Sequence, residues 1–329
     1  MDALLRSSRA ARLALGSAAA LGSASAAAAS ASALCEHPDA RWFREQADHQ
    51  ALGLTAVEEA RQGHWYEVAR KCREGDPNEA DVRGVSVLHF AAKAGRRQLV
   101  DILLGLGATP GAADRVHGRT PLHLAAAAGH MSTMQALLDA GADAAAADAA
   151  GATPLHLAAQ AGERGAVKLL LGRCDPNVRD LYGVTPLHKA VAFGQATSVA
   201  ALLDDPRTEV DRPVGEPRAP AEHGALSGGE TPLLLAASHT YHFHHTKHTR
   251  IASLLLAAGA DPNLVVAEAG GQTAAHRAAQ AGNAGVVASL LRCGRARWEL
   301  RDDRGRTPRE LAEEHGRTEV TRLLDAAGV

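Results

Sequence analysis

Short apolar stripes separated by turn residues follow one another along most of this chain. In one representative stretch, Thr153 suits the N-cap of a helix, and Pro154 suits its first turn because proline has no amide hydrogen to leave unbonded there. Leucine and alanine follow up to Gly162, a residue type that readily takes the left-handed conformation that closes a helix. A second stripe, at i, i+3 and i+4, consists of Val167, Leu170 and Leu171. The pattern predicts a helix, a turn, a second helix and a protruding loop.

Copies of this unit recur at an almost fixed interval. Four copies of a Gly-x-Thr-Pro-Leu-His-like stretch occupy residues 84–92, 118–126, 151–159 and 183–190. Their histidines are separated by 34, 33 and 32 residues. A period near 33 with Thr-Pro-Leu-His resembles the ankyrin repeat, and the resemblance covers roughly residues 51 to 329. It implies an all-α repeat solenoid of about six helix-turn-helix units with β-hairpin-like loops, placed between N- and C-terminal caps.

The two ends of the repeat region are more polar than its centre. Glu58, Glu59 and Arg61 stand where other units are apolar, which predicts a capping unit whose outward face meets water. In the last unit Arg309 and Glu310 replace leucine and histidine. The same argument predicts a cap at that end.

Residues 1–34 form a leader of different composition, joined by a linker at 35–50 to the repeat domain at 51–329. Asp2 is the only acidic residue of this leader, and its arginines are spaced for one helical face beside leucines. This composition resembles an organellar transit peptide, for example a mitochondrial one. A secretory signal cleaved after Ala31-Ser32-Ala33 and a disordered tail without an address are the alternatives. We expect an intracellular protein, cytoplasmic or organellar, in preference to a secreted one.

Two insertions interrupt the later units. A Pro/Gly-rich stretch at 213–229 lengthens one protruding loop, which is either a functional loop or a neutral addition. The next unit has Leu234 in place of the histidine and carries a His-rich insertion at 239–248. Within it, imidazoles at i, i+3 and i, i+4 have the spacing to bind zinc, nickel or copper, namely His242, His244, His245 and His248. A solvated polar turn is the competing interpretation.

Composition and charge exclude several functions. With 35 basic and 37 acidic residues the chain has no electrostatic footprint for nucleic acid. Only 3% of residues are aromatic while 46% are hydrophobic, so alanine and leucine must supply the core. The four cysteines have neither disulfide nor metal spacing, and no apolar run reaches the length of a membrane span.

The recurring histidines are predicted to be structural. In ankyrin repeats the imidazole at this position bonds to the threonine and to neighbouring backbone, and the resemblance assigns that role to His89, His123, His156, His188 and His276. No phosphate-binding glycine loop, metal-hydrolase helix or nucleophile elbow occurs in the sequence. We therefore expect no enzyme and no cofactor, apart from the metal just considered.

The resemblance implies a non-catalytic interaction module, a monomeric scaffold or adaptor that binds a protein on the concave face of its solenoid. Metal binding or metal sensing through the His-rich insertion is the alternative function. By position in the repeat, the partner-binding residues on the first helices are Phe90, Lys93, Gln160, Lys189, Phe193, Arg277 and Gln280. Those at the loop tips are Arg115, His117, Leu181, Tyr182, Asp303 and Arg304. Since aromatic residues often anchor interfaces, we expect the partner to dock across the fourth unit, which contains both Tyr182 and Phe193, and the fifth unit after it.

Overall fold

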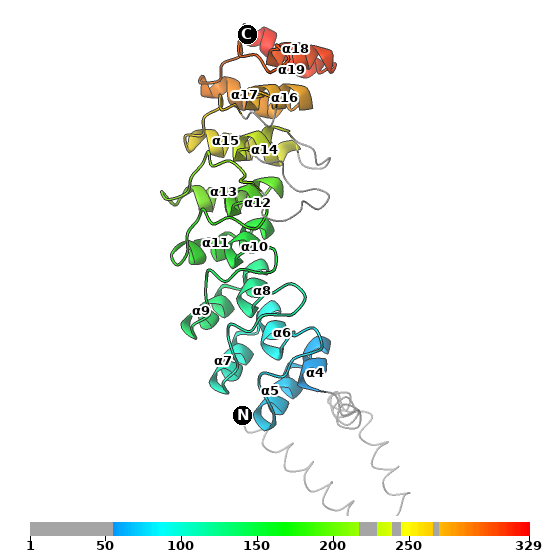
Figure 1. Cartoon of the computed structure of the whole chain (residues 1–329), viewed down its shortest axis with the longest axis vertical. Helices are drawn as coiled ribbons and strands as arrows, with labels where there is room; N and C mark the ends of the chain where they lie inside the picture. Colours follow the sequence, from blue (N-terminus) through cyan, green and yellow to red (C-terminus); the bar gives the residue numbers. More distant parts are fainter. Residues whose placement is uncertain (1–54, 217–228, 239–244, 266–269) are drawn as a thin grey trace, which may run out of the picture. The chain divides into compact units, whose positions relative to one another are not determined.

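The computed structural model describes residues 55–216, 229–238, 245–265 and 270–329, apart from the side chains of His245 and Thr246. The chain divides into two compact units, Met1–Thr55 and Ala56–Val329, and the second is the one described below. Within the described residues, sixteen helices form eight pairs (Figure 1). They are α4 (Ala56–Gln62), α5 (Trp65–Glu74), α6 (Val87–Lys93), α7 (Arg97–Gly105), α8 (Pro121–Ala127), α9 (Met131–Asp139), α10 (Pro154–Ala161), α11 (Arg164–Leu171), α12 (Pro186–Ala192), α13 (Ala196–Leu203), α14 (Pro232–Ser238), α15 (His245–Ala257), α16 (Ala274–Ala281), α17 (Ala284–Cys293), α18 (Pro308–Glu314) and α19 (Thr318–Ala327).

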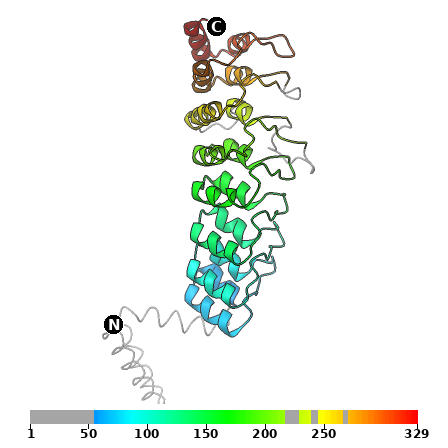
Figure 2. The same cartoon turned by 90° about the vertical axis from the view of Figure 1, so that its left-hand side faces the viewer.

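The pairs stack in chain order. The first helix of each pair packs on the first helices of its neighbours, as α10 does on α8 and α12, and the second helices pack in the same way, as α11 does on α9 and α13. Figure 2 shows both columns of helices and the loops between pairs, which project to one side. We call these loops fingers, and we call the surface made by the first helices and the fingers the inner surface. Six regular pairs, α6/α7 to α16/α17, thus lie between two terminal pairs, which confirms the predicted repeat solenoid.

The first helices begin where the sequence predicts, at a Thr-Pro or its equivalent. Thr153 is the N-cap of α10 and has an extended backbone, while Pro154 occupies the first turn. The backbone N–H of Thr153 donates to Nδ1 of His156 at 3.1 Å, which completes a capping box with histidine in place of the usual glutamate. Since Nδ1 accepts this bond, the proton of the neutral imidazole is on Nε2.

That Nε2–H joins each pair to the next one. His156 donates to the backbone carbonyl of Val184, in the following finger, at 3.0 Å. The same bond, from 3.0 to 3.2 Å long, is made by His89 to Arg119, His123 to Ala152, His188 to Glu230 and His276 to Arg306. We call these five residues the histidine ladder, and they confirm the structural role predicted for the repeated histidines.

Alanine supplies the closest contacts between first helices. Ala91, Ala125, Ala158 and Ala190 are all completely buried, each one in a first helix that packs on the next. Larger side chains from both helices of a pair, such as Leu155 and Leu170, fill the space between them. A core with few aromatic residues is therefore dense because its helices lie close together.

One expectation for the first pair is wrong. Glu59, predicted to face water, is fully buried on α4, because Lys71 of α5 lies 2.8 Å from one carboxylate oxygen and Nδ1 of His64 lies 3.1 Å from the other. Its burial is compensated by this ion pair across the helix pair. Arg61, in contrast, is exposed as expected, and Arg309 and Glu310 of the last pair are exposed as well.

The structure describes the ends of the long loop and the last part of the His-rich insertion. The base of the long loop is closed by two backbone hydrogen bonds, from Val214 to Glu230 and from Gly229 to Val214, both at 2.9 Å. The His-rich insertion overlaps the start of α15, which begins at His245. Among the described residues, no helix combines the length and the apolar character that a membrane crossing requires.

Candidate partner-binding site

The fingers are fixed by an aspartate at their base. In the finger before α10, the Oδ1 atom of Asp148 accepts hydrogen bonds from the backbone N–H groups of Ala150 and Ala152, both at 2.9 Å. Asp81, Asp180 and Asp302 accept bonds from the residues two and four positions later in the same way. Such local bonds hold the tip in one conformation without help from a strand. Outside helices, one isolated antiparallel bridge, Ala80 to Ser86, occurs in the described residues.

Neighbouring fingers are joined to each other along their tips. The N–H of Leu181 donates to the carbonyl of Ala150 at 2.9 Å, and the N–H of Arg115 donates to the carbonyl of Arg83 at 2.7 Å. Gly151 permits this approach, because its φ is +75° and a Cβ atom there would lie 2.8 Å from the backbone nitrogen of Leu181. The fingers joined in this way form a preorganised edge of the inner surface.

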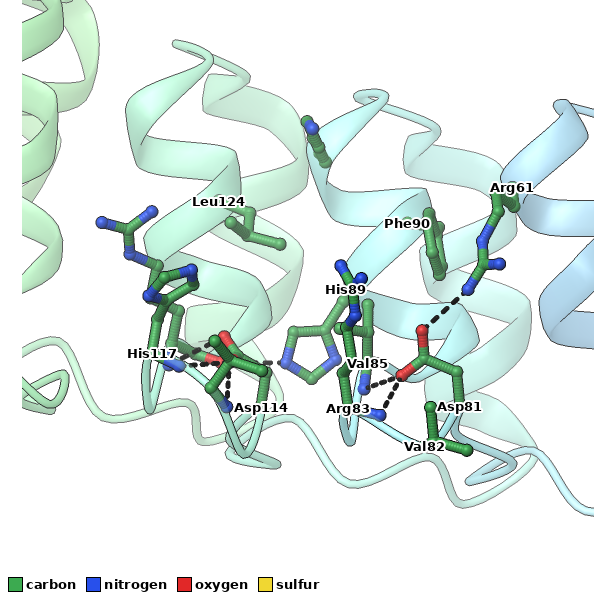
Figure 3. Close-up of a pocket in the computed structure, with 13 residues that line it drawn as sticks. Arg61, Asp81, Val82, Arg83, Val85, His89, Phe90, Asp114, His117 and Leu124 are labelled. Atoms are coloured by element: carbon green, nitrogen blue, oxygen red, sulfur yellow. Dashed lines mark hydrogen bonds and ion pairs between the residues drawn. The ribbon is translucent and has the colours of Figure 1, made fainter.

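A groove opens on the inner surface of the first three helix pairs. It has a volume of about 650 Å³ and lies between α4, α6 and α8 and the two fingers that precede α6 and α8 (Figure 3). We call it the N-terminal groove. It is lined by Arg61, Asp81, Val82, Arg83, Val85, His89, Phe90, Lys93, Asp114, Val116, His117, Arg119 and Leu124.

Both carboxylates of the N-terminal groove are already bound by the protein. Asp81 accepts bonds from the backbone of Arg83 and Val85 at 2.9 Å, and the guanidinium of Arg61 lies 2.8 Å from it, as Figure 3 shows. Asp114 is buried at the base of the next finger. Burial alone would raise the pKa of the Asp114 carboxyl, but hydrogen bonds from the backbone of His117 and its neighbours lower it overall. Both carboxylates are therefore satisfied by hydrogen bonds from the protein itself.

The cations of the groove are less engaged. Arg61 pairs with Asp81, and Arg119 approaches Asp148 at 3.4 Å. Arg83 and Lys93 are exposed, and within the described residues their side chains form no ion pair. The accessible charge of the groove is therefore positive.

Apolar side chains alternate with these cations. At the finger tips, Val82 is 89% exposed and Val116 is 55% exposed. Phe90 of α6 and Leu124 of α8 are half-buried and line the same groove (Figure 3). Such a surface offers both hydrophobic contact and charge.

The structure brings three of the predicted partner-binding residues together in this groove, namely Phe90, Lys93 and His117. Arg115 is exposed in the second finger of the groove, next to Val116, whereas Asp303 and Arg304 are exposed at the tip of the last finger. The remaining predicted side chains on α10, α12, α16 and the finger before α12 are half-buried, namely Gln160, Leu181, Tyr182, Lys189, Arg277 and Gln280. Two of them are engaged in ion pairs, Lys189 with Asp180 at 3.1 Å and Arg277 with Glu230 at 3.8 Å.

Tyr182 and Phe193 lie at opposite ends of α12. Tyr182 belongs to the finger before the helix, whereas Phe193, 49% exposed, is the C-cap residue. Since a helix rises about 1.5 Å per residue, roughly 10 Å of helix separates them. They can belong to one interface only if the partner spans the length of α12.

Little of the predicted metal site falls in the described structure. His242 and His244 lie outside the described residues, as does the side chain of His245. His248 is buried on α15, and a Cβ atom added to Gly194 of the preceding pair would lie 3.9 Å from its imidazole. Its position is thus that of a packing residue between pairs. The described residues contain no group of three or more histidine, cysteine or acidic side chains placed to hold a metal ion.

Several groove residues were absent from the sequence prediction, notably Val82, Arg83 and Val116. Val82 and Arg83 could have been predicted from the sequence, because Asp81-Val82-Arg83-Gly84 has the same spacing as Asp180-Leu181-Tyr182-Gly183. In that second stretch, Leu181 and Tyr182 are the predicted tip residues. The degraded repeat before Val82 concealed the match. The sequence does not show that Arg61 and Arg119 line the same groove, because this depends on how neighbouring pairs pack.

Comparisons with known proteins agree with this architecture. The family described as Ankyrin repeats (3 copies) matches residues 60–148, 88–180, 155–265 and 243–328. Human Rabankyrin-5 is 37% identical over 94 residues, which are 27% of this chain and only 8% of Rabankyrin-5.

Two crystal structures of ankyrin repeat domains align with most of the chain. One is that of Bcl-3, described as a unique member of the IkappaB protein family, with a TM-score of 0.58 and 27% identity over 72% of this chain and 97% of that one. The other is that of human ASB11, with a TM-score of 0.56 and 26% identity over 72% of this chain and 96% of that one.

Proposed function

Because the chain belongs to the ankyrin repeat family, whose domains are generally protein–protein interaction modules, we propose that it is a non-catalytic scaffold or adaptor that binds a protein partner on its inner surface. The observation that carries this proposal is the N-terminal groove, where finger tips and first helices expose valine, arginine and lysine side chains together. Aromatic residues and arginine frequently anchor protein interfaces.

The chemistry of the buried histidines favours binding over catalysis. Each imidazole of the histidine ladder uses Nδ1 for its own N-cap and Nε2 for the next finger. Burial also lowers the pKa of His156 and of His188 to about 4. Nδ1 is the only nitrogen left to accept a proton, and it already accepts the backbone N–H of its own N-cap residue, so these histidines cannot act as general bases without breaking that capping bond. The ankyrin repeat family is typically non-catalytic as well.

Partner capture with surface variants of the full chain tests this proposal. The first variant combines Tyr182→Ala with Phe193→Ala, at the two ends of α12, and the second combines Arg83→Glu with Lys93→Glu, in the N-terminal groove. Tyr66→Ala is the matched control, because Tyr66 is 68% exposed on α5, a second helix. We expect at least one inner-surface variant to lose the partner that the unaltered chain and Tyr66→Ala retain. Loss with Tyr66→Ala alone would place the interface on the second helices and contradict the proposal.

A further inference from the structure

Resting on the proposed function, we propose that the N-terminal groove binds an extended acidic segment of a partner protein, one in which carboxylates alternate with aliphatic side chains. The exposed cations of the groove are opposite in charge to such a segment, and the exposed aliphatic residues Val82 and Val116 line the same groove. In the region that contains Tyr182 and Phe193, Lys189 is already paired with Asp180.

The charge argument depends on which groups remain free for a ligand. Four cations line the groove, Arg61, Arg83, Lys93 and Arg119, against two carboxylates. Both carboxylates accept several hydrogen bonds from their own fingers, so they present little accessible negative charge. Arg83 belongs to the finger before α6 and Lys93 is the last residue of α6, and neither has a counterion among the described residues. An acidic ligand in the groove would supply one.

The apolar side chains of the groove favour a ligand that has aliphatic groups as well as negative charge. Val82 and Val116 stand at the tips of adjacent fingers, and Phe90 lies deeper in the groove. Their exposure has a free-energy cost in water that apolar side chains of a bound segment would remove. A segment with aliphatic residues between its carboxylates therefore fits this groove better than polyglutamate does.

The two fingers of the groove are held by hydrogen bonds of the protein itself. They are joined by the hydrogen bond from Arg115 to Arg83, and the second is joined to the next finger by the bond from Ala149 to His117, both at 2.7 Å. Each finger is also held by its own aspartate. A preorganised site loses little conformational entropy on binding, so modest contacts give measurable affinity.

Nucleic acid is the other polyanion to consider, and the groove fits it less well. Single-stranded nucleic acid is usually held by aromatic stacking platforms within a strongly basic channel. Phe90 is the only aromatic residue of the groove and is half-buried, and the chain as a whole has a formal charge of −2. The exposed groups at the tips are aliphatic, which favours a peptide.

Fluorescence anisotropy with the full chain tests the assignment. The probe is a short fluorescein-labelled peptide of alternating glutamate and leucine with serine spacers, and its comparison probe has lysine in place of glutamate. We expect the acidic peptide to bind and the basic one not to. Arg83→Glu with Lys93→Glu should weaken binding about tenfold or more, and Val82→Ser with Val116→Ser about fivefold. Raising the salt concentration should weaken binding further, since exposed charges are screened.

Arg73→Glu with Arg322→Glu is the matched control. It changes the charge by the same amount, and both arginines are exposed on second helices, α5 and α19. This control should leave affinity unchanged, and circular dichroism should be the same for all variants. Equal binding of both peptides, undiminished binding to Arg83→Glu with Lys93→Glu, or tighter binding of a labelled DNA oligonucleotide would each overturn the inference. If a native partner is still captured through Tyr182 and Phe193, the proposed function survives that result.

Discussion

At the scale of single residues, the histidine ladder makes the solenoid sensitive to pH. Its imidazoles are neutral, and burial lowers their pKa values, to about 4 for His156 and His188. Histidine in an unfolded chain has a pKa near about 6.5. A group whose pKa is depressed by folding favours the folded state above the unfolded pKa, and this stabilisation is lost as pH falls toward the folded value.

We therefore expect the free energy of unfolding to be constant between about pH 7 and pH 8 and to fall between about pH 6.5 and pH 4. Urea titrations followed by circular dichroism measure it. Asp114, Asp302 and Glu310, whose pKa values are lowered, contribute only near the acidic end of this window, while the raised pKa values of Asp211 and Glu230 act in the opposite direction. A free energy of unfolding that does not change from pH 7 to pH 5 would contradict the neutral ladder.

The finger glycines offer a second residue-scale prediction. Gly151 and Gly141 both have a positive φ, +75° and +89°, but a Cβ atom on Gly151 would meet the backbone of Leu181 whereas Gly141 has open space. Gly141→Ala should cost about 1–2 kcal/mol for the left-handed backbone alone, and Gly151→Ala about 2–4 kcal/mol because the next finger must move as well. The same denaturation assay measures both. Equal losses would mean that the fingers are not tightly joined.

At the scale of elements, one junction between the six regular pairs lacks the ladder bond. In α14 the position of the histidine is occupied by Leu234, which is buried and has no side-chain donor for the finger before α16. Its backbone N–H is bonded to Thr231, so the helix still starts normally. Since repeat solenoids are stabilised by nearest-neighbour contacts, a missing inter-pair bond weakens one interface by about 1 kcal/mol.

We expect the pairs from α16 to α19 to open together before the centre of the stack does. Hydrogen exchange followed by mass spectrometry should therefore show faster exchange in α16 and α17 than in α10 and α11. Leu234→His is not a clean test, because it places an imidazole in an apolar site as well as restoring a hydrogen-bond donor. Exchange in the unaltered chain is therefore the direct measurement. Slower exchange in α16 than in α10 would contradict this prediction and show that the missing hydrogen bond does not weaken the interface between α14 and α16.

Most of the element pattern was predictable, because helix starts and inter-pair bonds depend on local residues. Thr153, Pro154 and His156 lie within four positions of each other, and their spacing determines cap, first turn and ladder bond together. Glu59 was misplaced because its burial depends on Lys71, twelve residues later on the next helix. No local pattern distinguishes a carboxylate that faces water from one that faces a lysine.

At the scale of the whole molecule, net charge conceals the N-terminal groove. The 35 basic and 37 acidic residues nearly cancel, so the composition indicates no electrostatic footprint for nucleic acid. In the structure, finger aspartates accept hydrogen bonds from backbone N–H groups of their own fingers, whereas Arg83 and Lys93 are exposed. A count of charged residues does not distinguish these two situations. The predicted anchors Tyr182 and Phe193 belong to one repeat. Membership of one repeat does not show that the length of α12 separates them.

Hydrogen exchange of the full chain with and without its captured partner tests most directly whether the inner surface binds protein. We predict that the partner slows exchange in the fingers at 81–85 and 114–119 and at the exposed ends of α6 and α8. The second helices α5, α7 and α9 should exchange at the same rate in both states. Protection confined to those second helices, with the fingers unaffected, would contradict binding through the inner surface.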